Sequence, residues 1–362
     1  MGKPGRPRKQ KPLEEQVKEK AKSTIIKPKI ELISSGCDIL DIHIGGGFPV
    51  GTIINIAGPP SAAKTMLILK HISRCIKSLA EKFKWRYDDV EYRMLFDTED
   101  LFGFPILDDN LNHSRTIEEF NYNFTKFCKG LKKGERALYV VDSLDMLPPQ
   151  DAVNRSEEEY KTMDVGKKYE KGTYALKKQM YLSADFFNQK AAMARDHNCT
   201  LIFISQLRAN IGAIFGEKWK KSGGCALNHQ NTLEIWLEKI GTIKKDKIIR
   251  EIKRSEILGM IVRANTKKNS VTGKRSKCVF EVLDDIGIDN VASNIKYLFG
   301  DNCSSFNWDG KEFKGRGKDE ARNLLIRYIE ENNQEEKLIE EIKLLRKEIQ
   351  ESFSSSGRKK IY

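Results

Sequence analysis

The residues most able to do chemistry lie in one run of the chain, Gly58-Pro-Pro-Ser-Ala-Ala-Lys-Thr65. The apolar run 52–57 before it predicts a buried strand, and the residues from Met66 to about Phe83 predict a helix. Such a turn aims backbone N–H groups and the positive end of the helix dipole at one point, which favours a bound phosphate. The spacing is that of a phosphate-binding loop with Ala63 in place of the last glycine. The predicted nucleotide-binding residues of the loop are Gly58, Pro59, Pro60, Ser61, Ala62, Ala63, Lys64 and Thr65.

Two residues of this loop and one later carboxylate have distinct roles in such a site. Lys64 is placed to reach the β- and γ-phosphates, and the Thr65 hydroxyl is placed to hold Mg²⁺. Asp142 follows the predicted buried strand 137–141 and is the expected carboxylate of the Mg²⁺ shell. The predicted cofactors are therefore ATP and Mg²⁺. A chance turn before a helix, and a helix cap at Asp142-Ser143, are the alternative interpretations.

Polar residues also follow two other predicted strands. The strand predicted over 92–96 is followed by Glu99, and the carboxyl ends of parallel strands border the ligand crevice of an open α/β sheet. Glu99 is therefore predicted to polarise the water that attacks the γ-phosphate. The strand predicted over 200–204 is followed by Gln206, an amide that can hydrogen-bond the γ-phosphate and so distinguish ATP from ADP.

The charge of the chain indicates a polyanionic partner. The formal net charge is +13 at pH 7. Residues 1–28 carry nine Lys or Arg against three acids, and residues 243–277 carry twelve against three. Two basic blocks of this size favour a nucleic acid as the partner. Charge that only keeps the protein in solution is the alternative.

The segment after Gln206 mixes cations with large apolar residues. The cations Arg208, Lys218, Lys220 and Lys221 alternate with the aromatic residues Phe215 and Trp219. Such a mixture suits a phosphate backbone with stacked bases. An ordinary surface loop does not explain why these apolar residues would be exposed. The segment 150–172 is a second long polar excursion, and such loops are usually functional or disordered.

The alternation of predicted strands and helices indicates an α/β fold. No apolar run approaches the length of a transmembrane helix, and the basic N-terminus has no apolar segment behind it, so we expect neither a membrane protein nor a secreted one. The seven cysteines form no C-x-x-C pair, which argues against a zinc site or a disulfide framework. The predicted parts are a basic flexible arm (1–28), a nucleotide-binding core with DNA-binding loops (29–298), a small C-terminal α/β domain (299–352) and a basic tail (353–362).

Taken together, several of these runs resemble the bacterial RecA and phage UvsX recombinases. The resemblance extends over most of the chain in the family's order and leaves out only residues 1–28 and roughly 243–262. The runs that carry it are Ser34-Ser-Gly36, Gly58 to Thr65, Asp97-Thr-Glu99, Val140-Val-Asp-Ser143, Leu201 to Arg208, Ile211 to Gly216, Ser222 to Leu227 and Trp308-Asp-Gly-Lys311. The fold it implies is a RecA-type P-loop core, a mostly parallel twisted sheet with helices on both faces. Departures such as Ala63 favour a phage or mobile-element member.

The resemblance also implies a function and further site residues. Such a protein forms a helical filament on single-stranded DNA, binds ATP between neighbouring subunits, and exchanges the strand with a homologous double-stranded DNA. Lys267 and Lys268 lie where the family has two lysines that reach the neighbour's γ-phosphate, although the family separates them by one residue. The implied catalytic residues are Glu99, Lys64, Gln206, Lys267 and Lys268. The implied DNA-binding residues, in loops near 152–168 and 207–224, are Arg155, Arg208, Ile211, Gly212, Phe215, Lys218, Trp219, Lys220, Gly223 and Gly224.

The expected location is the cytoplasm of a bacterial cell or of a phage-infected host. Single-strand-binding proteins and loader or mediator proteins are the further partners that this function implies. Two alternative functions stay open at this point. One is a helicase or repair ATPase of the same fold that acts as a closed ring, and the other is a DNA-coating protein that binds ATP with little turnover.

Overall fold

The computed structural model describes residues 30–94, 97–154, 182–209, 219–221 and 225–353. The chain from Leu32 onward forms one compact unit. The N-terminal arm, most of the first DNA-binding loop and the basic tail, all predicted from the sequence, lie outside the described residues.

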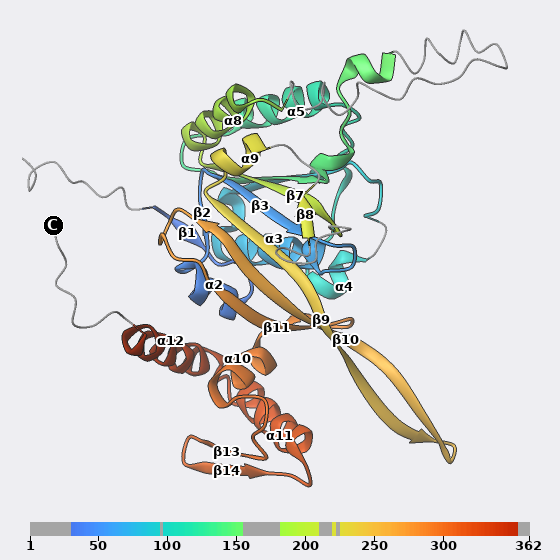
Figure 1. Ribbon diagram of the computed structural model, residues 1–362, viewed down its shortest axis with the longest axis vertical. Helices are drawn as coiled ribbons and strands as arrows, with labels where there is room; N and C mark the ends of the chain where they lie inside the picture. The colour runs from blue at the N-terminus through green and yellow to red at the C-terminus, as the bar shows by residue number, and fades with distance from the viewer. Residues whose placement is uncertain (1–29, 95–96, 155–181, 210–218, 222–224, 354–362) are drawn as a thin grey trace, which may run out of the picture. The chain divides into compact units, whose positions relative to one another are not determined.

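One mixed sheet organises the described chain (Figure 1). Its strand order is β12-β11-β10-β9-β3-β7-β6-β4-β5, with β8 paired to the end of β7. Neighbours are parallel from β9 through β3 to β5 and antiparallel from β9 to β12. The strands are β3 (Ile53–Gly58), β4 (Phe83–Asp89), β5 (Leu111–Asn112), β6 (Arg136–Asp142), β7 (Cys199–Ala209), β8 (Trp219–Lys221), β9 (Leu233–Ile249), β10 (Ile252–Asn269), β11 (Lys277–Leu283) and β12 (Gly287–Asp289).

Helices cover both faces of the parallel half of this sheet (Figure 1). All six residues of β3 are buried, as expected for a parallel strand with both faces covered. Ile54 and Ile56 pack with residues of α2 (Asp38–Ile44) and α3 (Lys64–Leu79) on one face. Ile53 packs on the other face with residues of α5 (Ile117–Gly130) and α8 (Ala184–Asp196).

Short elements complete this part of the chain. A two-stranded sheet of β1 (Leu32–Ile33) and β2 (Phe48–Pro49) lies next to α2 in the sequence. The remaining short helices are η1 (Ala80–Lys82), α4 (Thr98–Phe102), η2 (Asp108–Asn110), η3 (Leu144–Met146) and α9 (Cys225–Gln230).

The C-terminal part has a hydrophobic cluster of its own. Helix α10 (Asn290–Phe299) contributes Ile295 to this cluster, together with residues of α11 (Lys318–Glu331) and α12 (Glu335–Ser352). The hairpin of β13 (Ser305–Trp308) and β14 (Lys311–Lys314) adds Phe306 and Trp308. The sequence predicts a small hairpin at 306–310 and helices at 319–331 and 334–351, and the structure confirms them.

The structure changes the bounds of several predicted elements. Of the strand placed at 92–96, residues 92–94 are not in a strand and residues 95–96 lie outside the described residues; the strand is β4 at 83–89, which begins where α3 was expected to end. The alternating sequence of β4 keeps Lys84 exposed and buries its apolar neighbours, a pattern of a half-covered strand. Of the helix that the sequence predicts over 173–198, residues 173–181 lie outside the described residues and residues 184–196 form α8. The sequence also predicts short strands at 233–237 and 259–262, and both are present as parts of the much longer β9 and β10.

Candidate nucleotide-binding site

The predicted phosphate-binding loop joins β3 to α3. Ser61 and Ala63 have φ of 56° and 61°, and Ala63 is the left-handed residue immediately before α3. A glycine adopts this conformation at little cost, whereas an alanine is strained there. Ala63 therefore preserves the turn that the missing glycine would allow, and it does so with a strained backbone.

Lys64 and Thr65 open α3 and face the same cavity. The Lys64 Nζ donates to the carbonyl oxygens of Gly58 at 3.0 Å and Pro59 at 2.8 Å. Burial lowers the pKa of Lys64, while the carboxylates of Asp142, Glu91 and Asp145 act in the opposite direction. The ammonium group is thus held over the loop, where phosphate oxygens would replace the two carbonyl oxygens as acceptors.

A pair of oxygen donors fits a magnesium ion beside this lysine. The Thr65 Oγ1 donates to the Asp142 Oδ2 at 3.2 Å, and the Tyr87 hydroxyl donates to the same oxygen at 2.6 Å. Burial raises the pKa of Asp142, and the nearby charge of Glu91 raises it further. Mg²⁺ prefers one or two such oxygen ligands together with phosphates and waters. A divalent cation would relieve the cost of these buried carboxylates.

Glu91, and not Glu99, is the glutamate that lines this cavity. The turn after β4 is fixed by Asp89, whose carboxylate accepts from the backbone N–H groups of Arg93 and Met94. The Glu91 side chain is only 9% exposed and pairs with Arg93 at 2.9 Å. Glu99 lies on the exposed side of α4 and does not line the cavity.

Gln206 completes the site from the neighbouring strand. Its Nε2 donates to the Glu91 Oε1 at 2.7 Å, and the Ser143 hydroxyl donates to the same oxygen at 2.7 Å. The backbone N–H of Gln206 donates to Asp145 at 2.6 Å. The sequence placed Gln206 just after the end of its strand. In the structure β7 continues to Ala209, so Gln206 lies within the strand.

These residues enclose a cavity of about 450 Å³. Its walls come from the phosphate-binding loop, the start of α3, the turn after β4, the end of β6, and Gln206 within β7. The lining residues are Pro60, Ser61, Lys64, Thr65, Met66, Asp89, Glu91, Arg93, Met94, Asp142 and Gln206. The cavity thus combines a phosphate cradle, oxygen donors for a cation, a buried carboxylate and an amide, which together suit hydrolysis of a nucleoside triphosphate.

Sequence reasoning missed Glu91 and its support, Asp89. The cause was the position of the strand before them, which was placed at 92–96 and lies at 83–89. Had the alternating run that begins at Phe83 been taken as the strand, the rule that acids follow strands at the crevice would have pointed to these two residues.

Lys267 and Lys268 lie outside this cavity. A β-bulge between Thr266 and Lys268 gives the two lysines different neighbours. The Lys267 Nζ is 4.3 Å from the centre of the Trp236 ring. The Lys268 Nζ donates to the carbonyl oxygens of Asn228 and His229 at the end of α9, at 2.8 and 2.9 Å.

The described part of the predicted second DNA-binding loop is a hairpin. Strand β8 pairs with β7 so that Arg208 stands opposite Lys220 and Ala209 opposite Trp219. The other predicted DNA-binding residues lie outside the described residues, namely Arg155, Ile211, Gly212, Phe215, Lys218, Gly223 and Gly224.

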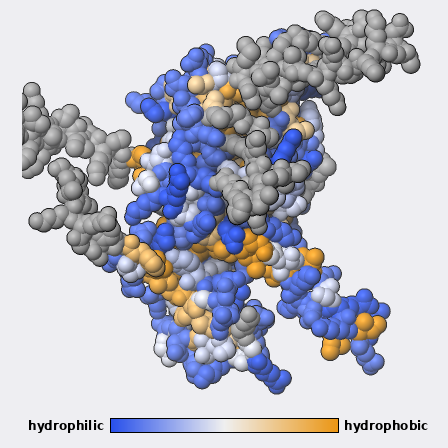
Figure 2. All heavy atoms as spheres, viewed as in Figure 1, coloured by the Kyte–Doolittle hydropathy of each residue, from blue (hydrophilic) through white to orange (hydrophobic). Residues whose placement is uncertain are grey.

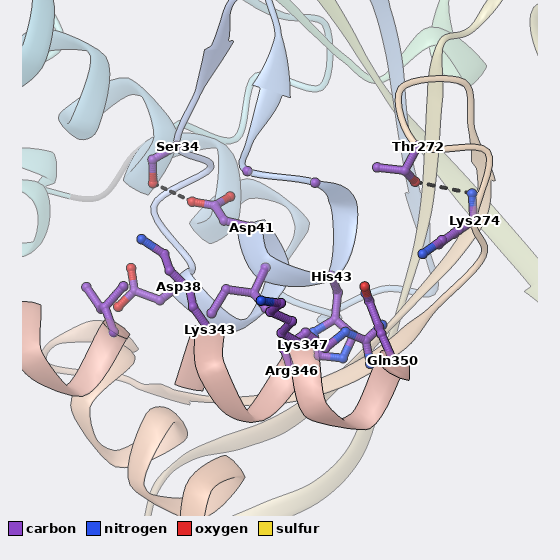
Figure 3. Close-up of a pocket in the computed structure, with 14 residues that line it drawn as sticks. Ser34, Asp38, Asp41, His43, Thr272, Lys274, Lys343, Arg346, Lys347 and Gln350 are labelled. Carbon is purple, nitrogen blue, oxygen red and sulfur yellow. Dashed lines mark hydrogen bonds between the residues drawn. The ribbon is translucent and has the colours of Figure 1, made fainter. Parts of the chain in front are cut away.

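A second cavity, of about 690 Å³, lies between α2, the turn near Thr272 and α12 (Figure 3). It contains none of the predicted site residues. Asp41 accepts from the Ser34 hydroxyl at 2.6 Å, and burial raises the pKa of its carboxyl to about 6. Burial lowers the pKa of His43 to about 4. The internal hydrogen bonds of Asp41 indicate a structural role for this carboxyl.

Comparison with known proteins decides the family. A family model described as the RecA N-terminal domain matches residues 14–102 and 121–289, which is more than half of the chain. The chain belongs to the RecA family. Its α/β fold with a mostly parallel central sheet agrees with that membership.

Its RecA-family relatives are distant but cover most of the chain. The chain is 26% identical to the protein RecA of Acinetobacter baylyi over 307 residues, which are 84% of this chain and 80% of the relative. It is 26% identical to the protein RecA of Acinetobacter baumannii over 335 residues, 91% of this chain and 84% of the relative. It is 28% identical to the mitochondrial DNA repair protein recA homolog of Dictyostelium discoideum over 269 residues, 74% of this chain and 53% of the relative.

Membership in the family makes the chain a RecA-type ATPase by homology. Among the helices of the described residues, none is both long enough and apolar enough to cross a membrane. The assignment to a phage or UvsX-like branch stays a prediction.

Proposed function

We propose that this RecA-family chain is a DNA-dependent ATPase that assembles into a helical filament on single-stranded DNA. In this proposal the filament pairs its strand with a homologous duplex and exchanges the two. The observation that carries the ATPase part is the single cavity that combines Lys64, Thr65, Asp142, Glu91 and Gln206. The DNA part is supported by family membership and by the net charge of +13.

In the proposed reaction each side chain has one task. Lys64 and the N–H groups of the loop bind the β- and γ-phosphates. Thr65 and Asp142 hold Mg²⁺, which when bound neutralises charge on the phosphates. Glu91 takes the role predicted for Glu99 and accepts the proton of the attacking water, because its carboxylate faces the cavity.

Gln206 is the proposed sensor of the γ-phosphate. It donates to Glu91 through its Nε2, so a phosphate oxygen in the same cavity would compete for that donor. Because Gln206 and Arg208 lie on one strand, a shift of the amide is passed to the start of the DNA-binding hairpin.

Lys267 and Lys268 are proposed to act on the nucleotide of a neighbouring subunit. Neither lines the cavity of its own chain, and both sit on the antiparallel half of the sheet. A cation supplied by a neighbour stabilises charge in the transition state, in the manner of an arginine finger. Hydrolysis would then require assembly on DNA.

The testing experiment is phosphate release from ATP, titrated with single-stranded DNA. We expect turnover to rise cooperatively with DNA and to be lost in Lys64→Ala, which cannot bind the phosphates. Turnover that is independent of DNA, or unchanged in Lys64→Ala, would refute the proposal. The apparent DNA affinity should fall steeply as salt rises, because phosphate contacts release counterions.

Electron microscopy separates the proposal from its two alternatives. Helical filaments on single-stranded DNA support the recombinase, whereas closed rings that unwind duplex would support a helicase or repair ATPase. Filaments with bound ATP but no phosphate release would support a DNA-coating protein, an outcome that the strained Ala63 makes worth testing. A cytoplasmic location and an interaction with single-strand-binding or mediator proteins belong to the same proposal.

A further inference from the structure

The outer part of the β9–β10 hairpin is paired only with itself. Pairing of β9 with β3 ends at Trp236, and pairing of β10 with β11 begins at Gly259. Within the described residues, the stretch 243–257 pairs only across its own turn (Figure 1). We call residues 243–257 the arm; they are distinct from the N-terminal arm at residues 1–28. At about 3.3 Å per residue, its strand from Ile243 to Ile249 is about 20 Å long.

The end of the arm exposes a pair of isoleucines. Ile249 and Ile252 stand opposite each other in the strand register, so their side chains share one face. They are 49% and 57% exposed. Figure 2 shows apolar residues at the end of the arm within a largely hydrophilic surface. The turn between them has φ of 50° at Arg250 and 64° at Glu251, as a tight two-residue hairpin turn requires.

Two cations stand directly behind these isoleucines on the same face. Lys247 is opposite Arg254, one pleat away from the isoleucine pair. In the part of the chain that the structure describes, neither cation has an ion-pair partner, and opposed like charges repel. The other face differs, because there Lys253 pairs with Asp246 at 2.8 Å. The face with Ile249 and Ile252 is therefore the one suited to DNA, a polyanion whose stacked bases offer an apolar surface.

We propose that the arm binds duplex DNA, with Ile249 and Ile252 wedged between base pairs and Lys247 and Arg254 on the flanking phosphates. Apolar side chains flanked by cations are the means by which minor-groove proteins unstack a base step. A contact with a second copy of this chain is the alternative occupant, and one outcome of the experiment separates it from DNA. The proposal deepens the proposed function, on which it rests for DNA as the partner, and adds a duplex contact outside the two predicted DNA-binding loops.

The experiment uses the full chain without nucleotide and a short duplex that carries 2-aminopurine, whose fluorescence rises on unstacking. We expect the wild type to bind the duplex and to raise the fluorescence. In the double variant Ile249→Ser/Ile252→Ser the fluorescence rise should be lost while binding stays within about threefold, because the phosphate contacts remain. In Lys247→Gln/Arg254→Gln the affinity should fall about tenfold at low salt, and the slope of log affinity against log salt should drop by about 1.8.

The matched control is Ile248→Ser/Ile257→Ser, which changes the same residue type on the opposite face. Ile248 and Ile257 are 78% and 57% exposed, so all these variants should keep the fold. The control should behave as the wild type. Equal loss of the fluorescence signal in the control and the test variant would overturn the insertion of Ile249 and Ile252 between base pairs. A wild type that binds duplex without unstacking it would overturn it as well.

Two further outcomes separate this inference from its rivals. If the isoleucine variant reduces light scattering of the DNA-free protein and leaves the duplex signals unchanged, the arm is a contact between copies and the inference is wrong. ATP turnover on single-stranded DNA should be unchanged in every arm variant. A wild type that unstacks duplex but has no DNA-dependent turnover would refute the proposed function and leave the arm's role standing.

Discussion

Replacing Glu91 by Gln tests the position of the general base most directly. The glutamine has the same shape and can still accept at its Oε1 from Gln206 and Ser143, both at 2.7 Å in the wild type. The ion pair with Arg93 is lost, but Arg93 is 77% exposed and such a pair contributes only about 0–1 kcal/mol. We therefore expect the free energy of unfolding to change by less than about 1 kcal/mol.

The effect on catalysis should be much larger than the effect on stability. A positioned general base typically contributes about 10²–10⁴ in rate. This corresponds to about 3–5 kcal/mol of the barrier. Phosphate release at saturating ATP and single-stranded DNA should fall by that factor, while binding of a fluorescent ATP analogue stays within about threefold, because Lys64 and the loop are untouched.

Glu99→Gln is the matched control, since Glu99 is a glutamate close in sequence whose side chain is exposed on α4. Its turnover should stay within about twofold of the wild type, as for most surface changes. A Glu99→Gln variant that loses turnover, together with an active Glu91→Gln variant, would show that the cavity described here is not the catalytic one. The general base would then be Glu99, as predicted from the sequence.

Three further predictions concern other parts of the molecule. Ala63→Val should destabilise the protein by about 1–3 kcal/mol in urea unfolding, because a β-branched residue is poorly accommodated at φ 61°, whereas Ala63→Gly should retain ATP binding; equal stability of the two variants would contradict the strain. Lys267→Ala and Lys268→Ala should each lower DNA-dependent turnover at least tenfold without weakening ATP binding to the DNA-free chain, and full turnover in both would remove the role of a neighbour's cation. Asp41 has a folded pKa of about 6 against an ordinary 3.8, so its contribution to stability is complete below 3.8 and is lost as pH rises through 6. Relative to Asp41→Asn, the wild type should therefore lose about 3 kcal/mol of unfolding free energy between pH 3.5 and 7 in urea titrations, and a constant difference would refute the assignment.

The parallel strands of the core could be predicted from sequence because burial on both faces leaves an unbroken apolar run. The runs in β3 and β6 carry this signature, and the loop before Lys64 follows from spacing alone. Strand β4 does not carry it, since Lys84 is exposed and Arg86 is half-buried between its apolar residues. The more apolar stretch near Met94 was therefore mistaken for the strand.

The position of Glu91 could not be predicted for a related reason. It depends on a turn held by the Asp89 carboxylate and on the side chains of Gln206 in β7 and Ser143 in the turn after β6. No local sequence pattern predicts that these side chains, which are far apart in the chain, come into contact with Glu91. The length of the β9–β10 hairpin was missed as well, because its outer residues alternate around no core and their composition resembles a polar loop.

Strand β7 has a consequence for how a signal would move through the molecule. Its first half is clamped between β3 and β6, and its last three residues pair with β8, with no break in the strand between them. Only about 10 Å of extended backbone separates the amide of Gln206 from Ala209. A continuous rod of this kind has no hinge that could absorb a displacement, so the candidate nucleotide-binding cavity and the β7–β8 pair form one mechanical part. Any agent that stiffens or dislodges that rod would alter both ends together.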